Sequence, residues 1–267
     1  MSGFSPDWLA LREPADHAAV NAEVRAACVR ALAGRDVVRV VDLGCGAGSN
    51  LRSLAPALEA RQQWVLVDND PVLLAAAERS ANGLSGLIDL TCKQVDISGA
   101  DWRSLLHDAD LVTASALFDL VSAPFIEAMA SEIAAMGCAF YTVLTYDGIA
   151  AFLPEHPADR PMREAFNRHQ QTDKGFGPAA GPAATDVLAN AFRRHGYKVR
   201  RGKSPWVLDN IRVPLRSELE KGWAAAVRET GLVPDHTIDN WLAHRQGAPS
   251  AVTIIGHEDL LALPEGD

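Results

Sequence analysis

Apolar residues along the chain follow two alternating patterns. Short aliphatic runs, often β-branched, predict buried strands, and stretches with an apolar residue every three or four positions predict the helices between them. The runs that predict strands cover residues 37–41, 64–67, 88–95, 111–115, 139–144, 197–201 and 251–255. Because strands that alternate with helices form open sheets with right-handed crossovers, we expect an α/β fold: a doubly wound, mostly parallel seven-stranded sheet with helices on both faces.

Capping residues indicate where the helices begin and end. The apolar repeat at residues 20–32 predicts an N-terminal helix that stops at Gly34. Thr185 is expected to cap a later helix, and Ser217 with Glu220 has the spacing of a capping box. Helical structure is therefore expected before the first strand and between the last two strands.

A glycine-rich loop follows the first expected strand. The strand ends at Asp42, and Gly44, Gly46 and Gly48 follow at alternate positions before a helical pattern begins. Glycine accepts backbone angles that a Cβ forbids and lets main-chain N–H groups approach a ligand, so the turn is expected to cradle a nucleotide. A dinucleotide site would need glycine where Ser49 stands. A carboxylate beside the loop would also repel a pyrophosphate, but it suits a ligand with ammonium and sulfonium groups.

The run at residues 42–48, Asp-Leu-Gly-Cys-Gly-Ala-Gly, resembles the D-x-G-x-G-x-G motif of the class I S-adenosylmethionine-dependent methyltransferases. With the acids downstream, the resemblance covers about residues 36–202 and 250–256. It implies S-adenosyl-L-methionine as the methyl donor, S-adenosyl-L-homocysteine as the product, and a last strand that lies antiparallel between the fifth and the sixth. The cofactor-binding residues that it implies in the loop are Asp42, Gly44, Cys45 and Gly46.

Acidic residues at the ends of the next two strands have the placement that this family uses. Asp68 ends the second strand, where a carboxylate can accept hydrogen bonds from both ribose hydroxyls, and Asn69 adjoins it. Asp70 is expected to be structural, as the N-cap of the next helix. After the third strand, Asp96 resembles the acid that accepts from the adenine amine, with Ile97 packing on the ring. The alternative for Asp96 is an ordinary helix cap.

The end of the fourth strand forms the floor of the methyl-transfer site in class I enzymes. The resemblance places Ser115, Ala116 and Leu117 there, beside the cofactor. Asp119 follows and either orients the donor or a substrate, or caps the next helix. The fifth strand delivers Tyr146 to the same edge. Asp119 and Tyr146 are therefore candidate catalytic residues.

The N-terminal segment carries Arg12 ahead of any strand. In the family that the chain resembles, such a segment often folds over the cofactor, where Arg12 could reach a carboxylate. The alternative is a salt-bridged arginine on the surface.

Residues 148–184 have a different composition, with many prolines and glycines among aromatic and polar side chains. A long connection of this composition inside a compact domain is usually functional or disordered, and the aromatic residues argue against disorder. We expect a lid that closes over a substrate. His156 and His169 are candidate general bases in it, although a loop histidine is more often only solvated.

We expect one methyltransferase domain over residues 1–267. Residues 1–35 would form an N-terminal cap, and residues 36–147 would form the cofactor-binding core. Residues 203–249 read as a helical insertion that joins the 148–184 segment in the lid.

Composition and charge narrow the class of partner. The 267 residues are 48% hydrophobic and carry a formal net charge of -9, which argues against a broad electrostatic grip on nucleic acid. A basic cluster at residues 193–203 is the exception, and alternation along a surface strand explains it more simply. No apolar run is long enough to span a membrane and no signal peptide is evident, so a cytoplasmic protein is expected. Neither a disulfide frame nor a metal site is expected, because the cysteines lack paired spacing: Cys28, Cys45, Cys92 and Cys138.

Several functions fit these features. A methyltransferase with a small-molecule acceptor is favoured by the acidic charge, by the aromatic lid and by the absence of the N-P-P-Y or Pro-Cys sequences of nucleobase enzymes. A tRNA or protein methyltransferase would require the 193–203 cluster to form one basic face. A non-catalytic S-adenosylmethionine-binding protein on the same fold is compatible with every cofactor motif, and a nicotinamide dehydrogenase fits least. The acceptor atom and the oligomeric state stay open.

Overall fold

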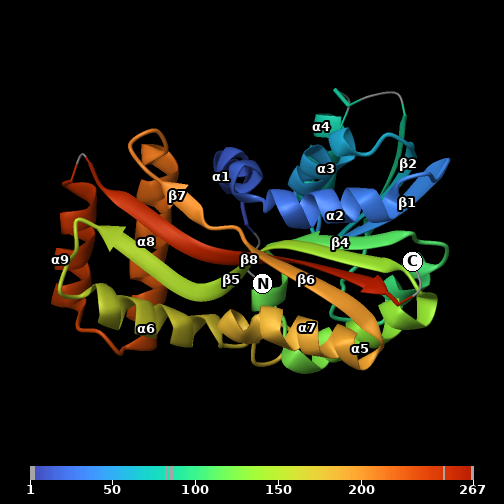
Figure 1. Ribbon diagram of the computed structural model, residues 1–267. Coiled ribbons are helices and arrows are strands. Elements are labelled where there is room, and N and C mark those ends of the chain that lie inside the picture. The colour runs from blue at the N-terminus through green and yellow to red at the C-terminus, as the bar shows by residue number, and fades with distance from the viewer. Residues whose placement is uncertain (1–3, 82, 85–86, 249, 266–267) are drawn as a thin grey trace.

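The computed structural model describes residues 4–81, 83–84, 87–248 and 250–265. Its centre is one sheet with the strand order β3-β2-β1-β4-β5-β8-β6, in which β7 pairs with β8 as an additional strand (Figure 1). Strands β1 to β5 are parallel, and β8 lies antiparallel between β5 and β6, which confirms the expected fold class and topology. The strands are β1 Val37–Leu43, β2 Arg61–Asp68, β3 Ile88–Gln94, β4 Leu111–Ser115, β5 Ala139–Leu153, β6 Tyr197–Lys203, β7 Trp206–Leu208 and β8 Val252–Pro264.

Helices cover both faces of the sheet. Alternate residues of β1 explain this, because Val38 and Val40 pack into one apolar cluster with α2, α3 and α4, and Val41 and Leu43 pack into another with α5 and α7. The α-helices are α1 Pro6–Ala19, α2 Ala22–Leu32, α3 Ser49–Leu54, α4 Pro71–Ala81, α5 Ala123–Met136, α6 Asp159–Gln170, α7 Ala184–Arg194, α8 Val213–Thr230 and α9 Asp235–Gln246. Short 3-10 turns are η1 Ala55–Ala57, η2 Asp101–Leu106, η3 Phe118–Leu120 and η4 Gly181–Ala183.

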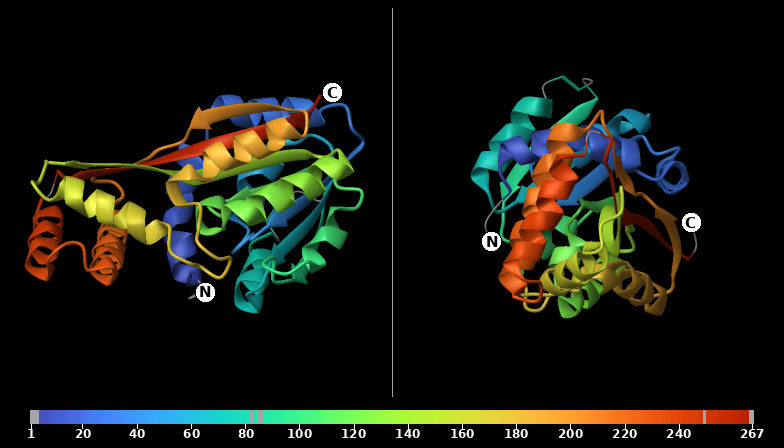
Figure 2. Two further views of the ribbon diagram at one scale, coloured as in Figure 1. Left: turned by 90° about the horizontal axis from the view of Figure 1, so that it is seen from below. Right: turned by 90° about the vertical axis from the view of Figure 1, so that its left-hand side faces the viewer.

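Strands β5 and β8 extend past the rest of the sheet and form an arm. Residues 150–153 of β5 pair with residues 252–255 of β8, and β7 adds a strand beside them. Helices α6, α8 and α9 all lie on one side of this arm (Figure 2). Phe152 points toward them and contacts the rings of α8 and α9, whereas Ile149 and Leu153 are exposed.

The expected lid loop at residues 148–184 is wrong in its secondary structure. Strand β5 continues to Leu153, helix α6 occupies the middle of the segment, and η4 leads into α7. The prolines that suggested a loop stand at element boundaries: Pro154 directly follows β5, Pro157 precedes α6, and Pro161 lies in its first turn. A high proline content here marks the joints between regular elements.

Two expected helix starts are also displaced. Helix α7 already includes Thr185, and helix α8 begins well before Ser217, so neither residue is a cap. Glu220 does not close a capping box, because it is buried and accepts a hydrogen bond from the Thr253 hydroxyl at 2.7 Å. Tertiary contact with β8 thus overrides a local capping signal. The expected N-terminal helix is α2, and α1 precedes it.

One extra residue in β5 changes which side chains face the arm helices. From Thr142 to Thr145, β5 advances by three residues, whereas the paired stretch of β8 advances by two. Such a bulge reverses the alternation of side chains. Val143 before it and Tyr146 after it therefore pack into the same apolar cluster.

Asp259 of β8 holds this bulge in place. Its fully buried carboxylate accepts from the backbone N–H of Leu144 at 2.9 Å, the backbone N–H of Asn21 at 2.7 Å and the Ser204 hydroxyl at 2.5 Å. Leu144 lies in the bulge and has a φ of 59°, a conformation that side-chain-bearing residues disfavour. One carboxylate thus joins β5 and β8 to the start of α2 and to the turn between β6 and β7.

In the part of the chain that the structure describes, no helix is long and apolar enough to cross a membrane. The same residues contain no group of three or more His, Cys, Asp or Glu side chains that could hold a metal ion. The cysteines are free thiols: Cys28, Cys45, Cys92 and Cys138.

Asp259→Ala should destabilise the fold far more than removal of an exposed carboxylate. Its hydrogen bonds are lost together and buried donors lose their partner, so we expect the free energy of unfolding to fall by roughly 2–4 kcal/mol. Urea unfolding measures this, with Asp89→Ala on the exposed side of β3 as the matched control. If the two variants lose the same stability, the bulge does not depend on Asp259.

Candidate functional site

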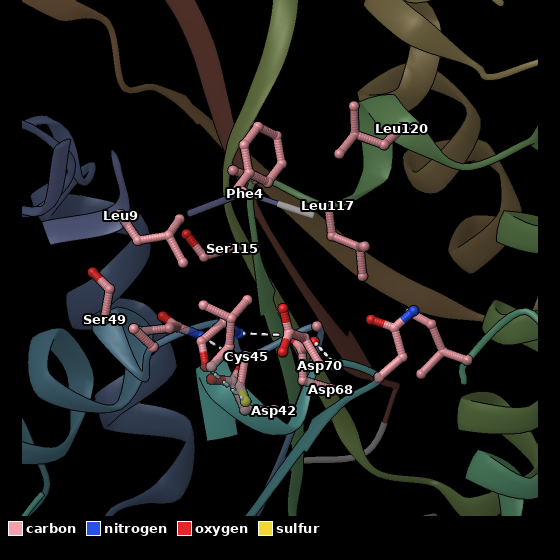
Figure 3. A pocket seen from close by; sticks show the side chains of 18 of the residues that line it. Phe4, Leu9, Asp42, Cys45, Ser49, Asp68, Asp70, Ser115, Leu117 and Leu120 are labelled. Atoms are coloured by element: carbon pink, nitrogen blue, oxygen red, sulfur yellow. Dashed lines mark hydrogen bonds between the residues drawn. The ribbon is translucent and has the colours of Figure 1, made fainter. Parts of the chain in front are cut away.

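A cavity of about 400 Å³, the first cavity, opens where β1, β2 and β4 end (Figure 3). Its walls come from the loop after β1, from the carboxyl ends of the strands and from α1. All the residues that the sequence assigned to cofactor binding line it: Arg12, Asp42, Gly44, Cys45, Gly46, Asp68, Asn69, Asp96, Ile97, Ser115, Ala116 and Leu117. The fold therefore brings this predicted set together around one space.

Two glycines let the loop after β1 run close to its neighbours at the first cavity. Gly44 and Gly46 have φ values of 65° and 53°, which glycine adopts without strain. A Cβ at Gly46 would lie 3.2 Å from a Leu9 methyl group, and one at Gly44 would lie 3.3 Å from Leu117. The loop therefore passes so close to α1 and to the residues after β4 that a side chain at either glycine would crowd them.

Asp68 is fixed between this loop and the next helix (Figure 3). One of its carboxylate oxygens accepts from the backbone N–H of Gly46 at 2.9 Å, and the other accepts from the backbone N–H of Asp70 at 3.0 Å. Asp70 in turn accepts from the Val72 N–H at 2.8 Å at the start of α4, which is the capping contact expected of it. The remaining lone pairs of Asp68 are left for a ligand.

Asp42 lies at the bottom of the first cavity and is fully buried. One oxygen accepts from the Asn50 amide at 3.1 Å, and Oδ2 has no hydrogen-bond partner among the described residues. Burial raises the pKa of Asp42 to about 7, and the nearby Asp68 adds to the increase. A cationic ligand group beside Asp42 would complete its hydrogen bonding and favour its charged form.

Apolar residues and an exposed acid form the other end of the first cavity. Ile97 is buried, and Asp96 accepts from the Ser98 backbone N–H at 2.9 Å. That contact closes a turn and is no helix cap, because η2 begins only at Asp101, and hydrogen bonds from Ser98 lower the pKa of Asp96. Phe176, from the chain after α6, also lines this end and packs edge-on against Phe125 with ring centroids 5.0 Å apart.

Arg12 lies at the wall of the first cavity and is paired within the chain. Its guanidinium binds both carboxylate oxygens of Asp16, at 2.9 and 3.2 Å, and stands 4.9 Å above the ring of Trp206. The Trp206 indole N–H also donates to Asp16 at 3.0 Å. Burial raises the pKa of Asp16, which the Arg12 charge opposes. The ion pair expected as an alternative is therefore present, but it is largely buried at the cavity wall.

A second cavity of about 340 Å³ adjoins the first. The two cavities share Phe4, Arg12, Ala116 and Leu120 in their walls. The other walls of the second cavity come from α1, η3, β5, α6, β7, α8 and β8, so the arm and the helices α6 and α8 form much of its lining.

A row of touching rings forms one wall of the second cavity. The ring centroids of Trp206 and His257 are 5.3 Å apart, and those of His257 and Tyr146 are 6.3 Å apart. The ring centroids of Tyr146 and Phe166 are 5.7 Å apart, and Phe166 stacks on Trp223 with ring centroids 3.9 Å apart. Burial lowers the pKa of His257 to about 3, so this ring is neutral at physiological pH.

Two candidate catalytic residues, Asp119 and Tyr146, line the second cavity. Asp119 is buried, and its Oδ1 has no hydrogen-bond partner among the described residues. Burial raises its pKa to about 6, although backbone N–H groups of Asp119 and Tyr146 oppose the increase. The Tyr146 hydroxyl donates to the Asn167 side chain at 2.7 Å, and burial raises its pKa, so it stays protonated.

The other two candidate bases, His156 and His169, line neither cavity. His169 is on α6, but its ring nitrogen faces Glu229 at 3.0 Å, whereas Phe166 and Gln170 of the same helix face the cavity. His156 precedes α6, and its Nδ1 accepts from the Ala158 N–H at 3.1 Å. Neither cavity supports a role as a base for these two histidines, and for His169 a single sequence does not show which face of α6 is turned inward.

Some lining residues had no signal in the sequence. Phe4, Leu9 and Phe176 come from segments before or after the core motifs, and only the fold brings them to the first cavity. The aromatic character of Phe176 within a glycine-rich segment was the one available hint.

Comparison with known proteins gives an independent result. Residues 40–136 match a family model described as a methyltransferase domain. The YcgJ protein of Bacillus subtilis is 14% identical, with 92% of this chain and 100% of that chain covered and a TM-score of 0.53. The cyclopropane synthase MmaA2 of Mycobacterium tuberculosis is 11% identical, with 97% and 94% covered and a TM-score of 0.52. At these identities the likeness concerns the fold. No curated protein matches the sequence.

Asp119→Asn should change how stability depends on pH. With its folded pKa raised from 3.8 to about 6, Asp119 loses its proton first in the unfolded chain, so its contribution is complete below about pH 4 and is lost as pH rises through 6. Asparagine does not titrate, so the variant should gain about 1–3 kcal/mol relative to the wild type between pH 4 and pH 7.5. Urea unfolding at both pH values measures this. A constant difference between the two proteins would contradict the buried, unpaired carboxyl group.

Proposed function

We propose that the chain is a class I S-adenosylmethionine-dependent methyltransferase that transfers a methyl group from a donor in the first cavity to a small molecule in the second. The observation that carries this proposal is the common wall. A methyl transfer needs donor and acceptor in contact, and two adjoining cavities that share Phe4, Ala116 and Leu120 in their walls would place them so.

The first cavity fits S-adenosylmethionine group by group. The unpaired Oδ2 of Asp42 suits the ammonium group of the donor, and the oriented carboxylate of Asp68 suits the ribose hydroxyls. Asp96 and Ile97 would hold the adenine, and Phe176 extends their apolar surface. When bound, the donor supplies an electrophilic methyl carbon on a sulfonium, a leaving group that is already activated.

The residues at the common wall would then mainly position the donor and the acceptor and keep water away from them. Ala116 directly follows β4 with a φ of 51°, and its N–H donates to the Val143 carbonyl at 3.0 Å, which fixes the floor between the cavities. Asp119 is the candidate base, because its pKa of about 6 leaves most of it charged at neutral pH and able to take a proton. Tyr146 is a positioning residue, since its hydroxyl is engaged by Asn167.

A small acceptor is favoured over a macromolecule by two observations. The second cavity is of small-molecule size and lies between the arm and helices α6 and α8, and three of the six basic side chains of the 193–203 cluster are paired with acids. Arg194 binds Glu127, Arg201 binds Asp186, and Lys203 binds Asp147 at 2.9 Å. This pairing neutralises half of the basic side chains that a tRNA-binding face would use. The non-catalytic alternative gains no support from an acceptor-sized cavity that adjoins the donor site.

Binding of S-adenosylhomocysteine tests the donor site. Calorimetry should show a micromolar-range dissociation constant and no binding of NAD. Asp68→Ala removes the ribose contacts and should weaken binding by about 1–3 kcal/mol, whereas Asp89→Ala on the neighbouring strand should leave it unchanged. Binding of NAD without binding of S-adenosylhomocysteine would overturn the proposed function.

Gly46→Val tests the loop. The branched side chain would meet Leu9 and require a strained φ, so cofactor binding should disappear while the far-ultraviolet circular dichroism is retained. Normal binding by a folded variant would show that the loop is only a turn.

A further inference from the structure

We propose, on the basis of this function, that the methyl acceptor is an amine that enters the second cavity as a cation and is held there between aromatic rings and the Asp119 carboxylate. The acceptor class follows from three properties of the second cavity: its rings, its charge balance and the unpaired oxygen of Asp119.

Aromatic faces are the first property. Besides the row of rings from Trp206 to Trp223, Phe4 and Trp8 also line the second cavity. These rings come from seven parts of the chain that are far apart in the sequence or in different elements: the segment before α1, and α1, β5, α6, β7, α8 and β8. A cation over such faces gains about 0.5–2 kcal/mol per favourable contact, and more when water is excluded. Neutral acceptors gain only the apolar part of this contact.

Charge balance is the second property. Among the described residues that line the second cavity, Arg12 is the only side chain with a permanent positive charge. Asp16 binds it through both carboxylate oxygens, and Trp206 covers one face of it. An anionic acceptor would therefore find no unpaired counter-charge, and it would be repelled by Asp119.

The unpaired oxygen of Asp119 is the third property. The carboxylate is 7% exposed, lines the cavity and leaves Oδ1 without a hydrogen-bond partner among the described residues. Such a group is costly unless a donor reaches it. An ammonium group supplies both the hydrogen bond and the opposite charge. The other acid in the lining, Glu218, is half-exposed and pairs with Lys221 at 2.7 Å, so Asp119 is the anion to which the amine is assigned.

The reaction balances with these groups alone. The ammonium group transfers a proton to the Asp119 carboxylate, which leaves a neutral nitrogen with a free lone pair. The lone pair forms the new N–C bond with the sulfonium methyl carbon as the C–S bond breaks and its electrons stay on sulfur. The products are an N-methylammonium group, the thioether S-adenosylhomocysteine and a protonated Asp119 that returns its proton to water.

Three probes of similar shape and different charge test the acceptor class: 2-phenylethylamine, 2-phenylethanol and phenylacetate. Trp8, Trp206 and Trp223 line the second cavity, so binding is followed by quenching of tryptophan fluorescence with S-adenosylhomocysteine saturating. We expect the amine to bind at least about tenfold more tightly than the alcohol, and the alcohol more tightly than phenylacetate. The amine should also be the probe that accepts a methyl group from S-adenosylmethionine.

Variants separate charge from packing. Asp119→Asn should reduce the amine affinity about tenfold and leave the alcohol and S-adenosylhomocysteine affinities within about twofold. Phe166→Leu keeps an apolar wall and removes a ring, so it should also weaken the amine more than the alcohol. Glu155→Gln, an exposed carboxylate at the end of the arm, is the matched control and should change neither.

The outcomes distinguish failure of the amine proposal from failure of the proposed methyltransferase function. If S-adenosylhomocysteine binds but the alcohol or phenylacetate equals the amine, or if Asp119→Asn leaves the amine affinity unchanged, the amine proposal is overturned and the methyltransferase proposal stands. If the wild-type protein does not bind S-adenosylhomocysteine at all, the proposed function fails and the amine proposal falls with it.

Discussion

The contact between the Asp259 carboxylate and the backbone of Leu144 determines how the parallel core of the sheet meets the arm formed by β5 and β8. Without the extra residue in β5, Tyr146 would point to the opposite face of the sheet. With it, β5 begins as a strand of the parallel core and continues as a wall of the second cavity. The same carboxylate fixes Asn21 and Ser204, so α2 and the turn before β7 are placed relative to this point.

The first cavity depends on a more general constraint. Parallel strands end at one edge of a sheet, so the acids after β1 and β2 converge there without any direct signal between them. Backbone N–H groups then orient Asp68, while Asp42 is left with one unpaired buried oxygen. The core therefore prepares a polar, oriented donor site, and the arm adds an aromatic cavity beside it.

Sequence reasoning recovered the features that local motifs encode. The strand runs, the glycine loop and Asp68 follow from short patterns that act through neighbouring residues, and the family resemblance placed the last strand between the fifth and the sixth. It failed where long-range contacts decide. The prolines and glycines of residues 148–184 suggested an irregular loop, although residues 150–153 pair with β8 and continue the strand β5. His169 looked like a base because one sequence cannot show which side of α6 faces the arm.

The bulge at Leu144 and the lining residue Phe176 had no recognisable pattern for the same reason. A bulge is specified by the carboxylate that satisfies it, and Asp259 lies more than a hundred residues away in the chain. Phe176 reaches the first cavity only because α6 and η4 return the chain to the core. Elements that combine core and arm are therefore the ones that sequence patterns predict least.

A crystal structure of the protein with bound S-adenosylhomocysteine tests the central claim most directly. The account predicts the ligand in the first cavity, with its ammonium group at Asp42, its ribose at Asp68 and its sulfur at the wall formed by Ala116 and Leu120, open toward the second cavity. A ligand whose sulfur faces away from that wall, or that lies outside the first cavity, would contradict it.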